Sequence, residues 1–466
     1  MTPEHWDALV VGAGQAGPAL AVRLAQAGHR TALIERDRLG GTCVNTGCTP
    51  TKTLVASARV AALARRAAEF GIGIGGEVSI DFARVMDRMR GVVGQSSHGL
   101  ESWLRQTQGL ELVSGHARFS APDTLVVGDR TLKAPNIFLN VGCRPVEPDW
   151  ARRSGVAYLT SDTLLSLEAL PAHLAIVGGG AIGLEFAQIF RRLGSQVTLF
   201  EMGDHLLARE DAEAATEVRA ALESDGVRFE LGSNCFGLEA GAEGDIMVGF
   251  ACGPLRERSA ATHVLVAVGR QPNTEDLGLE LAGVATDARG FIRVDGQLRT
   301  NVPGIWALGD VNGRGAFTHT SWNDHEVVAA NLLGGEARSI DPRVPRYALY
   351  VDPPLARIGD SEQQARERGG RVLVGRMPMK NVGRARERSE TRGFMKVLVD
   401  ADSMRLIGAT FVCIEADEVI HSLIAIMNAG ADVRSIATSV PIHPTVSELI
   451  PTMLQRLEPL RAAGQG

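Results

Sequence analysis

The chain has 466 residues, about three times the roughly 150 residues of an average domain, so we expect two to four domains. Its net charge of −6 and pI near 6.0 exclude a broad nucleic-acid-binding surface. Six cysteines are too few for a disulfide scaffold, which leaves core residues, metal ligands or a redox pair as their roles. Lysine is rare beside arginine, with four residues among the 48 basic ones: Lys52, Lys133, Lys380 and Lys396.

Nothing near the start of the sequence is typical of a targeting segment. An apolar run begins at Ala8 without the basic residues that precede a signal-peptide core. The longest apolar stretches, residues 8–24 and 421–431, are interrupted and fall short of the roughly 20 apolar residues of a membrane span. We therefore expect a cytoplasmic protein with no membrane and no nucleic-acid partner.

The first element in chain order is a strand–turn–helix–strand unit over residues 7–36. It has a GxGxxG turn after an apolar strand and an acid at the end of the second strand, as in a dinucleotide-binding βαβ unit. The first glycine permits a tight turn, the second the close approach of a pyrophosphate, and the third close packing of the helix. These positions are Gly12, Gly14, Gly17 and Glu35.

Two cysteines follow this unit within residues 40–52, GGTCVNTGCTPTK. Four residues separate Cys43 from Cys48, which is not the spacing of a zinc knuckle, and no second Cys or His pair lies nearby. In a cytoplasmic protein such a short-range pair favours a catalytic over a structural role, and the start of a helix stabilises a thiolate. We interpret the other four as core or incidental residues: Cys143, Cys235, Cys252 and Cys413.

A second copy of this unit lies further along the chain. Residues 173–202 align with residues 7–36 without a gap at an offset of 166. The repeated glycines and acid are Gly178, Gly180, Gly183 and Glu201. Two copies of the same unit predict two bound dinucleotides.

Other elements complete the prediction. The expected helices are 57–70, 82–104, 211–224, 416–429 and 446–457, and the expected strands are 110–119, 124–127, 264–269, 394–399 and 406–411. The strands and helices after residue 346 predict a final α+β domain.

Several motifs in the same order resemble the FAD-dependent pyridine nucleotide–disulfide oxidoreductases, which include glutathione reductase, dihydrolipoamide dehydrogenase and mercuric reductase. Besides the glycine turns and the cysteine segment they are AVGRQPNT at 267–274, TNVPGIWALGD at 300–310 and IHPTVSE at 442–448. The resemblance covers essentially the whole chain. It implies an α/β fold with two Rossmann-like domains, for FAD and NAD, plus a C-terminal α+β dimerisation domain. The implied boundaries are 1–148 and 272–344 for the FAD-binding domain, 149–271 for the NAD(P)-binding domain and 345–466 for the interface domain.

The resemblance implies catalytic roles for four residues in the first half of the chain. Cys48 matches the flavin-proximal thiolate that forms the charge-transfer complex, and Cys43 matches the interchange thiol that attacks the substrate. Lys52 matches the lysine near the flavin, and Glu185 matches its ion-pair partner. A buried lysine requires such a partner.

The resemblance also implies a base near the C-terminus. His443 matches the residue that protonates the leaving thiol, and Glu448 matches the carboxylate that orients it. Histidine suits this task because its pKa lies near working pH. In the family this histidine reaches the cysteine pair of the other subunit, which implies a homodimer with shared active sites.

The implied cofactors are FAD and NADH, with NADPH as the alternative. A carboxylate at Glu201 accepts ribose hydroxyls and repels a 2′-phosphate, which favours NADH. We expect no metal site. The cofactor-binding positions implied are Gly12, Gly14, Gly17, Glu35, Gly41, Thr42, Lys52, Gly309, Asp310, Gly178, Gly180, Gly183, Glu201 and Gly269.

The substrate is the least determined part of the prediction. Mercuric reductases carry a C-terminal cysteine pair and replace the His-Pro motif, whereas this chain keeps His443 and has no cysteine after Cys413. We expect hydride to pass from NADH through FAD to the Cys43–Cys48 disulfide, and then to a small disulfide or a thiol-bound oxidant such as a metal–thiol adduct. A mercuric or cupric ion reductase, a dihydrolipoamide dehydrogenase and a flavin-bearing redox sensor remain as alternatives.

Overall fold

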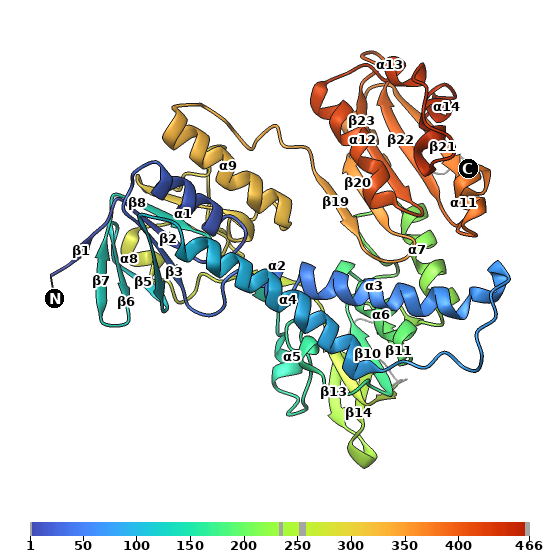
Figure 1. Ribbon diagram of the computed structural model, residues 1–466, viewed down its shortest axis with the longest axis horizontal. Helices are drawn as coiled ribbons and strands as arrows, with labels where there is room; N and C mark the ends of the chain where they lie inside the picture. Colours follow the sequence, from blue (N-terminus) through green and yellow to red (C-terminus); the bar gives the residue numbers. More distant parts are fainter. Residues whose placement is uncertain (1, 233–235, 251–257, 462–466) are drawn as a thin grey trace.

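A computed structural model describes residues 2–232, 236–250 and 258–461. Figure 1 shows three parts: two built on parallel sheets, and a third, formed by the C-terminal residues, built on an antiparallel sheet. In the described part of the chain, no helix is long and apolar enough to cross a membrane.

The first part is a five-stranded parallel sheet in the order β18-β8-β2-β3-β4. Its central strand β2 is buried along its whole length, as expected of a parallel sheet covered on both faces. Helices α1 and α9 lie side by side against this sheet (Figure 1). The bounds are β2 Ala8–Val11, β3 Thr31–Glu35, β4 Leu110–Ser114, β8 Asn136–Leu139, β18 Ile305–Ala307, α1 Gly17–Gln26 and α9 Thr318–Gly334.

A small sheet in the order β1-β7-β6-β5 and a two-stranded ribbon of β9 and β17 complete this part. Strand β18 belongs to the first sheet although it follows the whole second part in sequence, so the second part is an insertion into the first. The bounds are β1 Glu4–His5, β5 Ala117–Ala121, β6 Thr124–Val127, β7 Arg130–Lys133, β9 Cys143–Pro145, β17 Arg270–Pro272 and α8 Leu279–Ala282.

The second part repeats the plan with a four-stranded parallel sheet in the order β12-β11-β10-β16. An antiparallel sheet of β13, β14 and β15 packs beside it. The bounds are β10 His173–Val177, β11 Gln196–Phe200, β12 Arg228–Glu230, β13 Phe236–Ala240, β14 Ile246–Phe250, β15 Arg258–Ala261, β16 His263–Val266, α5 Asp149–Arg152, α6 Ala181–Leu193 and α7 Ala212–Asp225.

Two long helices connect the parts. The first half of α4 packs its Phe82 and Met86 into the core of the second part, while Leu104 near its end lies in the core of the first. Helix α3 lies against α6, with the C-terminal part on its other side (Figure 1). The bounds are α2 Gly41–Asn45, α3 Cys48–Arg65 and α4 Phe82–Arg105.

The third part is a six-stranded sheet in the order β19-β20-β23-β22-β21-β24. Helix α12 covers it, and its buried residues Ile420 and Leu423 belong to the core formed with the sheet. The bounds are β19 Arg346–Leu349, β20 Leu355–Gly359, β21 Val372–Pro378, β22 Phe394–Asp400, β23 Leu406–Val412, β24 Glu458–Pro459, α10 Glu362–Arg368, α11 Gly383–Glu387, α12 Ala416–Ala429, α13 Val433–Ala437 and α14 Ile450–Leu454.

Three sequence predictions were wrong in detail. The strand expected over 110–119 is two strands in different sheets, because Gly115 at φ +145° lets the chain turn between them. The helix expected from residue 57 already begins at Cys48, since Pro50 is tolerated in its first turn. The helix expected over 446–457 is a short 3₁₀ turn followed by α14, whose second residue is Pro451.

Candidate active site

The first glycine turn joins β2 to α1 and leaves no room for side chains. A Cβ on Gly12, which has φ +97°, would collide with the backbone of Asn140, and a Cβ on Gly17 would collide with the carbonyl of Gly12. The Asn140 side chain accepts a hydrogen bond from the Gly17 N–H at 2.9 Å and donates one to the Leu308 carbonyl at 3.0 Å. Asn140 therefore ties the turn to the neighbouring strand ends.

The second glycine turn, between β10 and α6, has the same construction. A Cβ on Gly178 would meet the Ala267 backbone, and one on Gly183 would meet the Gly178 carbonyl. A Cβ on Gly180, by contrast, would meet nothing within 4 Å, so the middle of the turn is open. This is the position that a pyrophosphate approaches in dinucleotide-binding turns.

The two acids at the strand ends bind backbone amides of their own units. Glu35 accepts hydrogen bonds from the Ala13 N–H at 2.7 Å and the Asp37 N–H at 2.9 Å. Glu201 accepts from Gly179 N–H at 2.6 Å and Gly203 N–H at 2.9 Å. Each carboxylate keeps free lone pairs for ribose hydroxyls. The sequence did not reveal that these acids also hold the glycine turn in place.

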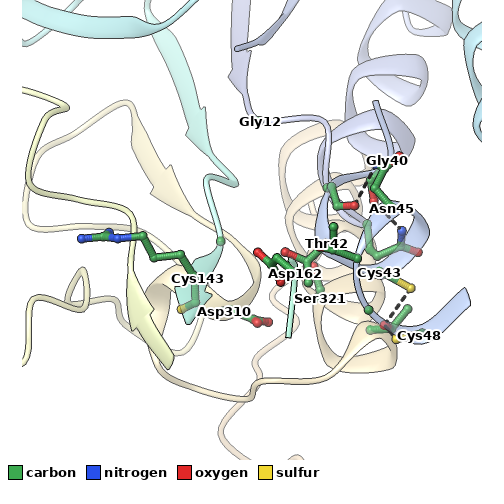
Figure 2. Close-up of a pocket in the computed structure, with 18 of the residues that line it drawn as sticks. Gly12, Gly40, Thr42, Cys43, Asn45, Cys48, Cys143, Asp162, Asp310 and Ser321 are labelled. Atoms are coloured by element: carbon green, nitrogen blue, oxygen red, sulfur yellow. Dashed lines mark hydrogen bonds between the residues drawn. The ribbon is translucent and has the colours of Figure 1, made fainter. Parts of the chain in front are cut away.

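The cysteine pair lies at the junction of two helices. Cys43 is in the single-turn helix α2, and Cys48 is the first residue of α3. The Thr318 hydroxyl, at the start of α9, donates to Cys43 Sγ at 3.2 Å and lies 3.1 Å from Cys48 Sγ. Figure 2 shows both sulfurs on one side of a cavity, opposite Asp310 and Cys143.

The two thiols have unequal acidity. The pKa of Cys48 is lowered to about 6, chiefly by the hydrogen bond from Cys43. Thr318 and Lys52 lower this pKa further, whereas burial and Glu185 raise it. The pKa of Cys43 is raised, first by its hydrogen bond to Cys48 and then by burial. When both sulfurs are reduced, Cys48 is therefore the thiolate and Cys43 the thiol.

An ion pair lies one helical turn beyond Cys48. Lys52 Nζ is 2.8 Å from one oxygen of Glu185 and 3.1 Å from the other, and the Glu185 side chain is only 7% exposed. Glu185 also accepts the Tyr350 N–H at 2.9 Å, and Lys52 Nζ lies 4.7 Å from the centre of the Tyr350 ring. The pair joins α3 to α6 and thus connects the cysteines to the second nucleotide unit.

One cavity of about 830 Å³ connects these features, within the size range of cofactor sites. It extends from the first glycine turn past the cysteine pair, as Figure 2 shows. Its lining continues to the start of α6, at Ala181 and Ile182. Burial raises the pKa of Asp310, whose carboxyl group faces it. The sequence-predicted residues that line it are Gly12, Gly14, Glu35, Gly41, Thr42, Cys43, Cys48, Lys52, Glu185 and Asp310.

This lining fits FAD. The glycine turn offers room and backbone amides for a pyrophosphate, Glu35 and Asp310 offer acceptors for hydroxyl groups, and Lys52 offers a cation beside the sulfurs. The remaining predicted residues do not line the cavity: Gly17, Gly178, Gly180, Gly183, Glu201, Gly269, Gly309, His443 and Glu448. Most of them belong to the second turn or to the C-terminal part.

His443 and Glu448 form a dyad away from the cavity of their own chain. His443 Nδ1 lies 2.7 Å from Glu448 Oε2, and the histidine side chain is 79% exposed while the glutamate is 10% exposed. The apolar neighbours Val440 and Ile442 are exposed as well, at 94% and 80%. An exposed, oriented histidine among exposed apolar side chains is the arrangement of an interface.

Sequence reasoning missed several residues of the site. No sequence pattern indicated Thr318 or Tyr350, because both are far from the cysteines in the sequence and approach them only in the folded chain. Asn140 had a weak signal, a polar residue directly after the buried strand β8. Cys143 is a buried core residue, which is one of its two expected roles, but the sequence did not reveal that it also lies in the cavity wall.

Of the other three cysteines expected to be core or incidental residues, one lies in the described part of the chain. Cys413 is buried in the C-terminal core, as expected. Cys235 and Cys252 lie outside the described residues. In the described part of the chain, no group of acidic, His and Cys side chains is arranged to hold a metal ion.

The structure has two nucleotide-binding units, and the cavity between them contains a pair of thiols. This arrangement defines an oxidoreductase in which a dinucleotide exchanges electrons with a dithiol. Comparison with known proteins gives the same class. The family described as pyridine nucleotide-disulphide oxidoreductase matches residues 6–324, and its dimerisation domain matches residues 345–454.

Individual relatives match over nearly their whole length. A probable pyridine nucleotide-disulfide oxidoreductase RclA of Escherichia coli is 36% identical over 452 residues, 95% of this chain and 97% of that protein. A dihydrolipoyl dehydrogenase of Bacillus subtilis is 34% identical over 446 residues, covering 95% of this chain and 96% of the relative. A solved Cu(II) complex of the HOCl-induced flavoprotein disulfide reductase RclA from Escherichia coli superimposes with a TM-score of 0.88 at 34% identity, covering 98% and 99% of the two chains.

The chain belongs to the pyridine nucleotide–disulphide oxidoreductase family. It is an FAD-dependent disulfide reductase that uses a pyridine nucleotide, and it carries the dimerisation domain of that family. The expected fold class, enzyme class and cofactors are thereby confirmed.

Proposed function

We propose that the protein uses NADH to reduce a Cys43–Cys48 disulfide and passes the electrons to a small disulfide or a thiol-bound oxidant. The observation that carries this proposal is that the sulfurs of Cys43 and Cys48 lie in the wall of one cavity and share the hydroxyl group of Thr318. Cys48 is the resting thiolate, and Cys43 is the thiol that attacks the substrate. When bound, FAD supplies the two-electron carrier between the nicotinamide and the disulfide.

The chain's own residues divide the binding of the two cofactors. We assign FAD to the first glycine turn, to the residues directly before Cys43 and to the loop that follows β18. Lys52 is assigned to the same site, beside the two sulfurs. We assign NADH to the second glycine turn, where Glu201 accepts ribose hydroxyls and disfavours a 2′-phosphate. The residues are Gly12, Gly14, Gly17, Glu35, Gly41, Thr42, Lys52, Gly309 and Asp310 for FAD, and Gly178, Gly180, Gly183, Glu201 and Gly269 for NADH.

The substrate step requires an acid that one chain alone does not bring to its cysteines. We assign this role to His443 of the partner subunit, oriented by the partner's Glu448. The Cys43 thiolate attacks one sulfur of the substrate disulfide, and a mixed disulfide forms as the substrate S–S bond breaks. The leaving thiolate takes a proton from the histidine Nε2, whose Nδ1 side is held by the carboxylate. The active form is therefore a homodimer with two shared sites.

Complementation between inactive variants tests this arrangement. Cys43→Ser and His443→Ala each abolish disulfide turnover, but in a mixed dimer one of the two sites regains both wild-type residues. Random reassembly of equal amounts yields half mixed dimers, so about a quarter of wild-type activity should return. No recovery, with mixed dimers verified by mass, contradicts shared sites. His98→Ala is the matched control, since His98 is an exposed histidine of α4.

A cupric ion is a second candidate for the electron acceptor. The favouring observation is the close structural match to a reductase solved as its Cu(II) complex. Cu(II)-dependent NADH oxidation that survives His443→Ala but not Cys43→Ser would favour this acceptor, because a metal ion needs no protonated leaving thiol. Turnover of dihydrolipoamide with NAD would instead favour the activity named for the dihydrolipoyl dehydrogenase relatives.

We also propose the division of the chain into domains and its location. Residues 1–148 and 272–344 form the FAD-binding domain, 149–271 the NAD(P)-binding domain and 345–466 the interface domain. The pairing of β18 with β8 across the insertion supports the discontinuous first domain. A cytoplasmic location suits the free thiols of Cys143 and Cys413.

A further inference from the structure

The hydroxyl group of Thr318 lies between the two sulfurs of the redox pair. Its oxygen is 3.2 Å from Cys43 Sγ and 3.1 Å from Cys48 Sγ, within hydrogen-bond range for sulfur. A threonine hydroxyl has one proton to donate and two lone pairs to accept with. It can therefore donate to one sulfur while it accepts the S–H of the other, and the two arrangements exclude each other.

The neighbouring residues fix Thr318 in this position. It is the first residue of the 17-residue helix α9, directly after Phe317. The Phe317 ring stacks on His319 and on Tyr347, with ring centres 5.4 and 5.3 Å apart and the rings nearly parallel. The His319 ring also contacts the Arg346 carbonyl at 2.8 Å. Contacts on both sides of Thr318 thus hold the hydroxyl beside the sulfurs.

We propose that Thr318 is a positioning residue that donates its proton to whichever of the two sulfurs is the thiolate and relays a proton between them. The Cys43 S–H has two acceptors within reach, the Cys48 thiolate and Thr318 Oγ1. In the arrangement that prepares the relay, it donates to Thr318 Oγ1, and Thr318 O–H donates to the Cys48 thiolate. When Cys43 is activated for attack, its proton passes to Thr318 Oγ1, and the hydroxyl proton passes to Cys48. The products are a Cys43 thiolate and a Cys48 thiol, with charge conserved and no electrons moved.

Other charged and titratable groups also act on Cys48, from α2, α3, α6 and the segment that follows β19. Cys43 and Lys52 lower its pKa, Glu185 raises it, and the Tyr350 hydroxyl group lies close enough to be affected by its charge. These groups act on the resting thiolate. Thr318 differs from these groups because its hydroxyl contacts both sulfurs. Removal of the hydroxyl should therefore change the reactivity of Cys43 as well as that of Cys48.

The test is the pH dependence of alkylation at each sulfur in the reduced holoenzyme, measured with iodoacetamide and mass spectrometry. Thr318→Val keeps the shape and removes the hydroxyl. We expect the midpoint for Cys48 to rise by about one pH unit or more, because a hydrogen bond to a charged group is lost. We expect the Cys43 rate at pH 7 to fall about tenfold, because its thiolate loses the same donor.

Two further variants complete the design. Thr318→Ser restores the hydroxyl and should restore both values, whereas Thr216→Val, on the exposed face of α7, should change neither. An unchanged Cys48 midpoint overturns the proposal. An alkylation rate of Cys43 that rises or stays constant in Thr318→Val overturns the relay. If Thr318 donated to Cys48 alone, its loss would make the Cys48 thiolate less stable and leave more of the negative charge on Cys43. Faster alkylation of both sulfurs, the result of an opened site, also overturns it.

The proposal rests on the assignment of Cys43 and Cys48 as the redox pair, and the same measurement separates the two failures. If NADH does not generate two new thiols at these positions in the wild-type protein, the assignment itself fails. If NADH generates them and Thr318→Val leaves their titration unchanged, only the role of Thr318 fails.

Discussion

Substitution of Lys52 and of Glu185 should move the acidity of Cys48 in opposite directions. The pKa of Cys48 is lowered chiefly by the hydrogen bond from Cys43 and further by Thr318 and Lys52, while burial and Glu185 raise it. Lys52→Met removes a stabilising cation, so the pKa should rise. Glu185→Gln removes a destabilising anion and frees the lysine, so the pKa should fall.

The size of the effect follows from the geometry. With a pKa of about 6, the Cys48 thiolate outnumbers the thiol by about ten to one at pH 7. A neighbouring charge shifts a pKa by about 1 to 3 units, and Lys52, whose side chain is 33% exposed, belongs at the lower end of this range. Lys52→Met should therefore bring thiolate and thiol to about equal amounts at pH 7.

The assay is the rate of Cys48 alkylation in the reduced holoenzyme between pH 4 and 9, which follows the thiolate fraction. Lys133→Met is the matched control, because Lys133 pairs with Asp123 at 3.0 Å in the exposed β6–β7 region and is remote from the cysteines. Shifts of Lys52→Met and Glu185→Gln in the same direction would refute the electrostatic reasoning. So would an unchanged midpoint in both.

Two other predictions concern specificity and stability. The kcat/KM for NADH should exceed that for NADPH by about tenfold or more, and Glu201→Gln should bring the ratio towards one, because the repulsion of a 2′-phosphate is removed. Lys396→Met should destabilise the protein by about 3 kcal/mol or more, against less than about 1 kcal/mol for Lys133→Met. The Lys396 side chain is 1% exposed and pairs with Asp211 at 2.8 Å and Glu362 at 2.7 Å. Its loss takes the buried cation from Asp211, which is 8% exposed, while Glu362 retains Arg366 at 2.8 Å. Denaturation midpoints of the three proteins check this, and equal midpoints for the two variants would contradict it.

The sequence predicted those parts of the site that depend on local geometry. A tight turn that a Cβ would obstruct requires glycine, so Gly12 and Gly178 were visible from spacing alone. The cysteine pair was visible because its members are close in sequence. The same locality explains the errors in element boundaries, since proline or glycine at 50, 115 and 451 decided those boundaries.

The rest of the site depends on long-range packing that no local pattern encodes. Thr318 contacts Cys43 across 275 residues of sequence, and Asn140 contacts Gly17 across 123. Single threonines and asparagines are common, so neither is distinctive before the fold is known. His443 was found through its motif, and it does not line the cavity of its own chain, as its expected role in the site of the other subunit requires.

Anaerobic titration with NADH, followed by thiol counting, tests the central claim most directly. The account predicts that one equivalent of NADH per oxidised subunit generates two new thiols, located by differential alkylation at Cys43 and Cys48. A long-wavelength charge-transfer absorption band should accompany them and be absent in Cys48→Ser. Oxidation of NADH and bleaching of the flavin with no new thiol at either position would contradict the claim.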